Sequence, residues 1–478
     1  MTRLPWKELL LFSFIAFCYI ICSAPDVSWA TPLGDDLGDI ALATENFRPL
    51  HAPGFPTILP IGYVFAHLPV LNIWQGLSLL SCLSFLGCSV LIFLIVRHYT
   101  TLRIAPFVGS VTFSAAPLVF CEGISSKGFE YGVSLFLCLL LFYLIKTDKK
   151  GLASIVGALA LGTHPLAILF TVVVALRYLW SPRYVAIVLS GVFLYSYLPF
   201  ITRPPFGQSS PSGNPLQILC TEVLPLLFSM HASELLGRLR DVVPLLFGGL
   251  GLLILPFVKI GRNKDVSTLL WVSVFIIFYV VTVAYSAHIE YLSFSLAFLI
   301  ILSCSLLSKV KLTPRMASLM LIVPMVILVI NVQMYDIGRT LDPSPTNARQ
   351  YFETLKALPD RSIVIAQYTH VWTLTNYYEC AENENDIILV GPGTMAKWPW
   401  CADDLRSRGL NVPEILESST GWTEDFTYAD NFPRILKEAN SDRSIYWAVL
   451  TQAKKLDFIL VPADSDGGPS VPDIYLSY

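Results

Sequence analysis

Three aspartates that closely follow the first apolar segment are the clearest candidates for chemistry. Asp35, Asp36 and Asp39 lie between Gly34 and Gly54 of a chain that is 54% hydrophobic. Carboxylates are costly inside a bilayer and usually serve a function at its edge. A helix would place Asp36 and Asp39 on one face, because residues three apart are neighbours there. The pair predicts either a general base at a membrane surface or the cap of a short surface helix.

The composition of the chain that carries these acids is typical of a polytopic membrane protein. The 478-residue chain has a mean hydropathy of +0.61 and only 14% charged residues, against roughly 25% in soluble proteins. The charges are uneven, with 21 acids and 12 bases from Asp336 onward and 14 acids and 20 bases before it. The C-terminal part is therefore expected to be an acidic domain in water. No basic stripe suits nucleic acid, so no nucleic-acid partner is expected.

Eleven apolar segments approach the roughly 20 residues that a membrane span requires. They are Leu9–Ala24, Trp74–Val96, Ile104–Cys121, Tyr131–Ile145, Leu152–Gly162, Pro165–Trp180, Tyr184–Phe200, Val242–Ile260, Val266–Ser286, Glu290–Leu307 and Arg315–Val332. Lysine and arginine favour the cytoplasmic side of spans. All dense basic clusters fall on one side only if Leu152–Trp180 breaks at Gly162–Pro165 and crosses twice. The charge pattern thus predicts eleven crossings with the N-terminus inside.

This topology divides the chain into two domains. Residues 1–333 form a polytopic α-helical transmembrane domain with large outer loops at residues 25–73 and 201–241. In the first loop, Thr57–Leu71 is apolar but short, and is expected to be a helix that lies on the membrane. Residues 334–478 form a small extracytoplasmic α/β domain.

The α/β prediction rests on short β-branched runs that alternate with helical segments. The expected strands are Ser362–Ala366, Asp386–Val390 and Phe458–Pro462. A strand–helix–strand order implies parallel pairing. Cys380 and Cys401 also lie in this domain, where they could pair in an oxidising compartment or remain two free thiols.

Two motifs resemble those of a known membrane family in order and spacing. Asp36–Asp39 (Asp-Leu-Gly-Asp) resembles Asp-x-Gly-Glu, and His51–Pro56 (His-Ala-Pro-Gly-Phe-Pro) resembles His-Pro-Pro-Gly-Tyr-Pro. These motifs belong to the protein O-mannosyltransferase-like membrane proteins within the GT-C class of glycosyltransferases. The departures are Asp39 in place of Glu and Ala52 in place of the first Pro.

Further similarities follow in the same order along most of the chain. Phe120–Tyr131 resembles the family's Trp-x-Gln-x5-Glu-x-Tyr segment, although Gly128 stands at the Glu position and only a shifted register brings in Glu130. Thr163–Pro165 resembles the family's Asn-His helix break, and Tyr197–Arg203 resembles its Tyr-Leu-Pro-Leu-Arg segment. In the tail, Ala357–Ile365 and Asp386–Val390 resemble the family's first two strands. The shared order carries the resemblance.

The resemblance implies a GT-C-like fold and a glycosyltransferase activity. Such enzymes use a polyprenyl-phosphate sugar as donor, a substrate that stays in the membrane as a lipid-linked sugar. Asp36 corresponds to their catalytic aspartate in the first outer loop, and Asp39 is expected to support it. The reaction would move a mannose-like sugar to a protein or glycan acceptor on the outer or lumenal side. The sequence assigns no metal ligands and leaves metal dependence, sugar, acceptor and oligomeric state open.

The chemistry assigns roles to further residues. An acceptor hydroxyl must lose its proton to a carboxylate as the anomeric bond breaks, and the leaving phosphate needs cations. Arg203 and Arg48 are candidates for the phosphate, because arginine offers a bidentate fork. Each is alternatively an interfacial anchor among lipid headgroups.

Other candidates for the substrate site are polar residues of the outer loops and of one helix break. They are His51, Glu122, Lys127, Glu130 and His164. His51 either contacts substrate or orders its loop, and His164 either serves the site or satisfies backbone groups freed at the break. Lys127 either binds phosphate or pairs with the glutamates. His288 and Glu290 open a span on the outer side and are further candidates.

Two other classes of function remain compatible with the sequence. A lipid-linked substrate transporter or flippase would show broken helices at matching positions of two halves, whereas one break, at Gly162–Pro165, is visible. A non-catalytic envelope-biogenesis scaffold would use the C-terminal domain for docking and would tolerate Asp36→Asn. Short inner loops and a compact tail favour a bacterial inner membrane with the site facing the periplasm, with the endoplasmic reticulum as the alternative.

Overall fold

The computed structural model describes two compact units of the chain. It covers residues 6–23, 44, 47, 56–71, 73–125, 128–191, 193, 232–247, 264–282, 289–307, 313–341, 358–366, 387–390, 406, 409–411, 432–450 and 456–460. The helical unit comprises Met1–Ser28, Gly54–Tyr197 and Asn214–Thr340, and the second unit, which contains a sheet and is called the α/β unit, comprises Trp29–Pro53, Leu198–Gly213 and Leu341–Tyr478. The predicted residues Asp36, Asp39, Arg48, His51, Lys127, Arg203, Cys380 and Cys401 lie outside the described residues.

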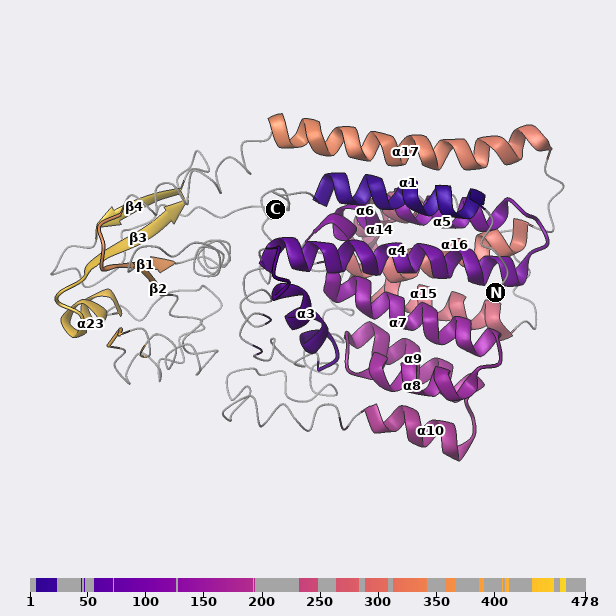
Figure 1. The fold of residues 1–478 in the computed structure, drawn as a ribbon, viewed down its shortest axis with the longest axis horizontal. Helices are drawn as coiled ribbons and strands as arrows, with labels where there is room; N and C mark the ends of the chain where they lie inside the picture. Colours follow the sequence, from indigo (N-terminus) through magenta and orange to yellow (C-terminus); the bar gives the residue numbers. More distant parts are fainter. Residues whose placement is uncertain are drawn as a thin grey trace. The chain divides into compact units, whose positions relative to one another are not determined.

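Long apolar runs form the helical unit. Its elements are α1 (Trp6–Ser23), α3 (Ile58–Ala66), α4 (Ile73–Tyr99), α5 (Ala105–Ala115), α6 (Pro117–Ile124), α7 (Phe129–Lys146), α8 (Lys150–Leu161), α9 (Pro165–Tyr178), α10 (Pro182–Leu189), α14 (Ala232–Phe247), α15 (Lys264–Thr282), η5 (Ile289–Tyr291), α16 (Leu292–Leu307) and α17 (Pro314–Leu341) (Figure 1). Among the described helices, α4, α7, α15 and α17 are long and apolar enough to cross a membrane. The count of eleven crossings stays a prediction.

Burial separates a central helix from a peripheral one. In α7, 78% of the membrane-span window is buried, and it packs on α4, α8 and α9 (Figure 1). In α17 the buried share is only 11%, as expected for a helix that presents its apolar side chains to lipid. The short helix α3 crosses α4 so closely that a Cβ at Gly76 would lie 2.0 Å from the Phe65 carbonyl oxygen. This contact requires glycine and fixes α3 against the start of α4.

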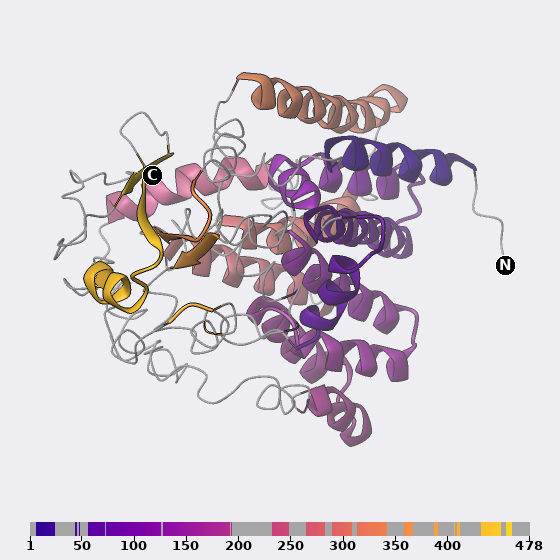
Figure 2. The ribbon, with the colours of Figure 1, turned by 60° about the vertical axis from the view of Figure 1, so that its left-hand side comes forward.

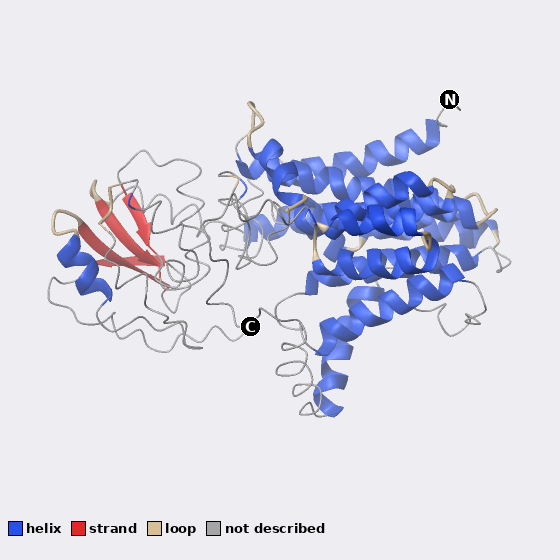
Figure 3. Ribbon diagram, turned by 90° about the horizontal axis from the view of Figure 1, so that it is seen from below, coloured by secondary structure: helices blue, strands red, loops and turns tan. Residues whose placement is uncertain are grey.

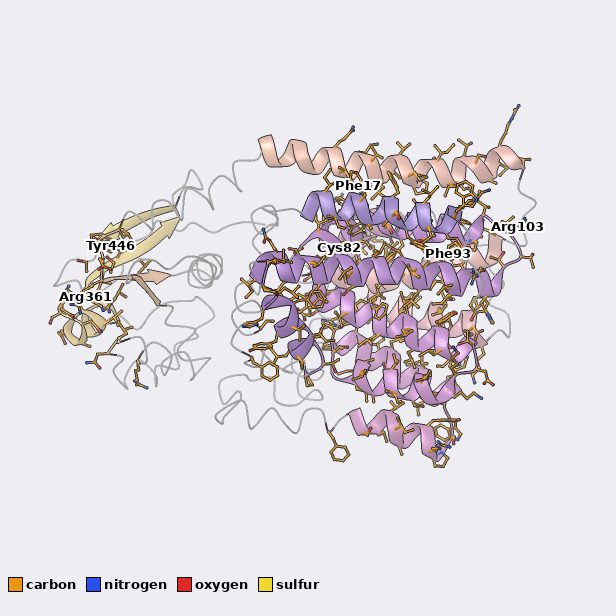
Figure 4. The ribbon with its side chains drawn as sticks, viewed as in Figure 1. Phe17, Cys82, Phe93, Arg103, Arg361 and Tyr446 are labelled. Carbon is orange, nitrogen blue, oxygen red and sulfur yellow. The ribbon has the colours of Figure 1, made fainter. Side chains whose placement is uncertain are left out.

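One end of the helical unit, which we call the basic end, gathers the Lys/Arg-rich ends of several helices. Arg97 near the end of α4 lies 3.6 Å from Glu8 at the start of α1. Lys146 Nζ at the end of α7 lies 4.6 Å from the ring of Tyr178 at the end of α9. Figure 4 shows Arg103 beyond the same end of α4, closer to Phe93 than to Cys82. Several basic residues thus gather at this end, whereas Arg238 on α14 lies at the other end, where it donates to the carbonyls of Val281 and Thr282.

The segment that contains α8 and α9 is a helical hairpin. α8 begins next to the end of α7, and α9 returns to that same place, because Tyr178 contacts Lys146. The predicted helix break is confirmed, since α8 ends at Leu161 and α9 begins at Pro165. The two helices are short, at 12 and 14 residues.

Three predicted boundaries differ in the structure. Ile104–Cys121 is not one straight span, because Pro117 lacks the N–H that a continuous helix needs, and α5 and α6 meet at 66°. The outer loop predicted to end at residue 241 contains helix α14 from Ala232 onward. Helix α17 continues to Leu341, so the predicted domain boundary at residues 333 and 334 falls inside a helix.

The α/β unit contains a four-stranded sheet. Its elements are β1 (Ser362–Ala366), β2 (Ile387–Val390), α23 (Phe432–Ala439), β3 (Ser444–Leu450) and β4 (Leu456–Leu460), and the strand order is β2-β1-β3-β4. All described strands belong to this unit (Figure 3), and α23 lies beside the sheet (Figure 2). β1 pairs in parallel with β2 and β3, and β4 is antiparallel to β3. The parallel pair β1–β2 was expected from the sequence, whereas β3 was not predicted.

Candidate functional site

A buried polar cluster lies at the end of the helical unit opposite the basic end, which we call the polar end. We define the Tyr131 cluster as Glu130, Tyr131, His164, Glu290 and Tyr291. These residues come from the start of α7, the break before α9 and the turn η5 before α16. Since α7 and α9 both finish at the basic end, their first residues lie at the other one.

Hydrogen bonding and ring contacts join these residues. The Tyr131 hydroxyl donates to Glu290 Oε1 at 3.0 Å. The His164 ring lies edge-on to Tyr131 and Tyr291, with centroids 5.4 Å and 4.7 Å away. Glu130 and His164 are 3% and 2% exposed. A buried group of this polarity is expected to be fully hydrogen-bonded or to meet a ligand.

His164 owes its position to the helix that follows it. It is the N-cap of α9, where Nδ1 accepts a hydrogen bond at 3.3 Å from the Leu166 N–H, and Pro165 occupies the first helical position. Proline suits that position because its missing N–H is not needed there. Since Nδ1 acts as an acceptor, Nε2 carries the proton and is the ring's donor. His164 thus satisfies the freed backbone, as one of its two predicted roles, and its ring lies in the Tyr131 cluster; its role in a substrate site stays a prediction.

Two carboxylates lie where α6 ends and α7 begins, namely Glu122 on α6 and Glu130 on α7. A Cβ at Gly128 would lie 1.8 Å from the Glu122 carbonyl oxygen, so no side chain fits at the position where the related family has Glu. The buried carboxylate comes instead from Glu130, as in the shifted register. The Tyr131 cluster brings together three of the predicted residues, Glu130, His164 and Glu290, and Glu122 lies on α6, where one of its carboxylate oxygens is buried.

A repeated dipeptide marks the two aromatic residues that the sequence interpretation left unassigned. Glu-Tyr occurs at residues 130–131 and again at 290–291, each time where an apolar segment begins. The structure places the two tyrosine rings 5.8 Å apart. This repeat was the available signal for Tyr131 and Tyr291 as members of one site.

Thr57, just before α3, is hydrogen-bonded to the end of α8, close to this cluster. Thr57 directly follows the His51–Pro56 motif. Its N–H donates to the Gly162 carbonyl at 2.8 Å, and its hydroxyl donates to the Leu159 carbonyl at 2.7 Å. Both acceptors belong to the end of α8, immediately before the break at His164. Thr57 therefore lies close in the fold to the helix break that carries His164.

A second, half-buried polar cluster lies at the basic end. We define the Asp265 cluster as Asp265, Lys146, Tyr99 and Tyr178. The Asp265 carboxylate accepts hydrogen bonds from Lys146 and from the hydroxyls of Tyr99 at 2.8 Å and Tyr178 at 2.7 Å. These contacts tie the start of α15 to the ends of α4, α7 and α9. In the described part of the chain, no group of His, Cys, Asp and Glu is arranged to hold a metal ion.

Comparison with known proteins gives one sequence relative and a set of similar folds. No protein-family model matches the chain. The protein O-mannosyl-transferase tmem260 of Dictyostelium discoideum is 25% identical over 136 residues, which are 28% of this chain and 16% of that protein. The match thus spans about a sixth of the relative's length.

The fold is similar to that of ArnT from Cupriavidus metallidurans. The structure bound to undecaprenyl phosphate has a TM-score of 0.54 and 13% identity, and the alignment covers 98% of this chain and 100% of that chain. The apo structure has a TM-score of 0.50 and 12% identity, with 97% and 99% covered. The predicted fold class and resemblance are therefore confirmed: this chain is an integral membrane protein with a GT-C-like fold, similar to protein O-mannosyltransferases.

Proposed function

We propose that this protein is a membrane glycosyltransferase that moves a sugar from a polyprenyl phosphate to an acceptor hydroxyl. The observation that carries this proposal is the Tyr131 cluster, a buried group of carboxylates, tyrosines and one histidine in a helical membrane fold. Thr57, which directly follows the His51–Pro56 motif, is hydrogen-bonded to the helix end that precedes His164. The ArnT structure with a similar fold is bound to undecaprenyl phosphate, which supports a polyprenyl-phosphate-linked donor.

The charge of the cluster indicates which part of the substrates it serves. Carboxylates repel a phosphate, whereas sugar hydroxyls donate hydrogen bonds to carboxylates. We therefore assign Glu122, Glu130 and Glu290, together with the Nε2 donor of His164, to hydroxyl groups of the sugar or acceptor. The phosphate falls to Arg48, Lys127 and Arg203, the cations predicted from the sequence for that role.

The reaction that follows is a single displacement in which Asp36 is the base. As the acceptor oxygen bonds to the anomeric carbon, its proton passes to the Asp36 carboxylate. The bond between the anomeric carbon and the phosphate oxygen breaks, and the polyprenyl phosphate leaves with the electron pair. Asp39 supports Asp36, and His51 orients the substrate or its loop.

The basic end gives the site an orientation. Lysine and arginine gather on the cytoplasmic side of membrane proteins, and Arg97, Lys146 and Arg177 lie near helix ends on one side of the unit. The polar end then faces outward. We infer a bacterial inner membrane with the site toward the periplasm, or the lumenal side if the membrane is that of the endoplasmic reticulum.

The helix breaks favour an enzyme over a transporter. A transporter built from two repeats would carry matching breaks in both halves. The breaks at Ala116 and at Gly162–His164 both lie in the first half of the chain. In the described second half, α17 passes through Pro324 as one helix.

The test is a donor panel with the purified full-length chain in lipid nanodiscs. Polyprenyl-phosphate mannose and other polyprenyl-phosphate sugars are supplied with protein and glycan acceptors, and release of polyprenyl phosphate is measured. Consumption of one donor by the wild type, and not by Asp36→Asn, supports the proposal. If no donor is consumed but sealed vesicles show the lipid crossing the membrane, the protein is a flippase and the proposal is wrong.

A further inference from the structure

The bend between α5 and α6 leaves two backbone carbonyls without their helical partners. In an unbroken helix, the N–H groups of Leu118 and Val119 would bond to the carbonyls of Ser114 and Ala115. The chain instead turns by 66° at Ala116, and the first bond of α6 runs from the Phe120 N–H to the Ala116 carbonyl. Such orphaned carbonyls are costly in a membrane unless other groups bond to them.

Two side chains from distant helices supply those bonds. The Tyr19 hydroxyl of α1 donates to the Ser114 carbonyl at 3.1 Å. The Asn331 Nδ2 of α17 donates to the Ala115 carbonyl at 2.8 Å. Each orphaned carbonyl therefore receives one donor, and the bend is stabilised from outside α5 and α6.

Asn331 is unusual in its helix. The span in α17 from Arg315 to Gln333 has a hydropathy of 2.2, and only 11% of it is buried. The neighbouring Ile330 is 46% exposed. A polar residue within such a span needs a partner and commonly has a function, and the partner of Asn331 is the bend.

Helix α6 carries Glu122, one of the predicted site residues. Glu122 lies six residues beyond Ala116, or about 9 Å along the helix axis, so a change of about 20° in the bend would move it by about 3 Å. A Cβ at Gly123 on α6 would lie 2.0 Å from the Tyr19 ring. α6 therefore also packs directly against that ring.

We propose that Asn331, together with Tyr19, is a positioning residue that holds α6 in its bent orientation and thereby sets the place of Glu122. The structural part of this proposal stands on the bend alone, and its consequence for turnover rests on the proposed glycosyltransferase function. The peripheral helix α17 thus acts on the site through one hydrogen bond.

Cys121 offers a readout that does not require activity. It is exposed, whereas the other described cysteines are buried, and it precedes Glu122 on α6. In Asn331→Leu, which keeps the side-chain shape and removes the donor, we expect the rate of maleimide modification at Cys121 to change by about 3- to 10-fold, as for loss of one hydrogen bond. Peptide mass spectrometry of the full-length protein in nanodiscs resolves this thiol from the others. Tyr19→Phe should change the rate in the same direction.

Two further variants separate positioning from general damage. Asn331→Gln keeps an amide donor and should restore the wild-type rate at least in part, while Ile330→Leu should leave it unchanged. Unchanged Cys121 modification in both Asn331→Leu and Tyr19→Phe would overturn the proposal. A change equally large in Ile330→Leu would also overturn it.

Kinetics on the active donor then test the link to Glu122. Asn331→Leu should raise KM or lower kcat in the same pattern as Glu122→Gln, and the double variant should lose little more than either single one. If the two losses add fully, Asn331 does not act through Glu122 and that link is wrong. If the wild type transfers no sugar while Cys121 modification still shifts, the proposed function fails and the helix-positioning role holds.

Discussion

The two ends of the helical unit both bury polar side chains, but their charges are arranged for different purposes. In the Asp265 cluster one carboxylate accepts hydrogen bonds from an ammonium group and two phenols, so its charge and its lone pairs are used within the protein. In the Tyr131 cluster a phenol donates to the Glu290 carboxylate, and the buried Glu130 and the His164 imidazole lie in the same group. The first arrangement pairs a carboxylate with an ammonium group, whereas the second gathers acidic and aromatic side chains around one imidazole.

This difference indicates which cluster serves mainly stability and which serves function. A closed ion pair with satisfied hydrogen bonds holds helices together, and its loss is felt mainly as lost stability. Several ionisable side chains gathered around one buried imidazole are typical of sites that meet a ligand. The basic end is thus expected to be structural and the polar end functional, and substitutions at the two ends should separate these effects.

The largest effect on turnover is expected from Asp36→Asn, which replaces the proposed base. The amide keeps the shape of the side chain but cannot accept the acceptor's proton, so turnover should fall by about 10²- to 10⁴-fold. Donor consumption by the purified protein measures the loss, and binding of the lipid donor should persist. Full transfer activity in this variant would show that the base lies elsewhere.

The next effect concerns the basic end. Asp265→Asn leaves the partly buried Lys146 without its counter-charge, and the free energy of unfolding should fall by about 2 to 4 kcal/mol. Thermal unfolding in detergent measures it, and activity at low temperature should remain. Asp148→Asn is the matched control, because the Asp148–Lys150 pair is exposed at 3.5 Å. An equal loss in both variants would contradict a structural role specific to Asp265.

A smaller effect is expected from Tyr131→Phe at the polar end. The substitution removes the hydrogen bond to Glu290, and a bond to a charged group contributes about 1.5 to 3 kcal/mol. Since we place this bond at the substrate site, kcat/KM should fall by roughly tenfold or more, while Tm falls less than in Asp265→Asn. A variant that unfolds early yet keeps its kcat/KM would place Tyr131 among the structural residues instead.

The smallest effect is expected from a substitution of Thr57, which is hydrogen-bonded to the end of α8. Thr57→Val removes the hydroxyl bond to Leu159 but keeps the backbone bond to Gly162. We expect a loss of about 1 kcal/mol in stability and a modest rise in KM, measured on the same protein. A loss of turnover as large as in Asp36→Asn would mean that this anchor itself shapes the reaction centre.

Hydropathy and charge predicted much of the helical unit, because both are local properties of the chain. The apolar runs around α4, α7 and α15 and the break before His164 were readable in this way. The bend at Pro117 was not recognised, because the apolar run continues through it and its donors, Tyr19 and Asn331, lie far away in sequence. β3 was missed although Ser444–Leu450 is rich in β-branched and aromatic residues.

The site was only partly predictable, for a similar physical reason. Glu130 and His164 stood out as polar residues next to apolar runs, which a sequence displays directly. Tyr131 and Glu290 are 159 residues apart, and only the tertiary packing of the helical unit brings them into contact. The roles of Asp36 and Arg203 stay predictions, since both residues lie outside the described part of the chain.

The Asp265 cluster also has a consequence for how the protein is made. As a membrane chain is inserted from its N-terminus, the ends of α4, α7 and α9 are in place before α15 is synthesised. Their partner arrives 166, 119 and 87 residues later, as counted from Tyr99, Lys146 and Tyr178. Until then Lys146 has no Asp265 to pair with, so the early helices form an incomplete assembly. Biogenesis of the membrane domain is thus expected to finish as one cooperative event when α15 enters, and a ribosome stalled before residue 264 would leave a product for membrane quality control to remove.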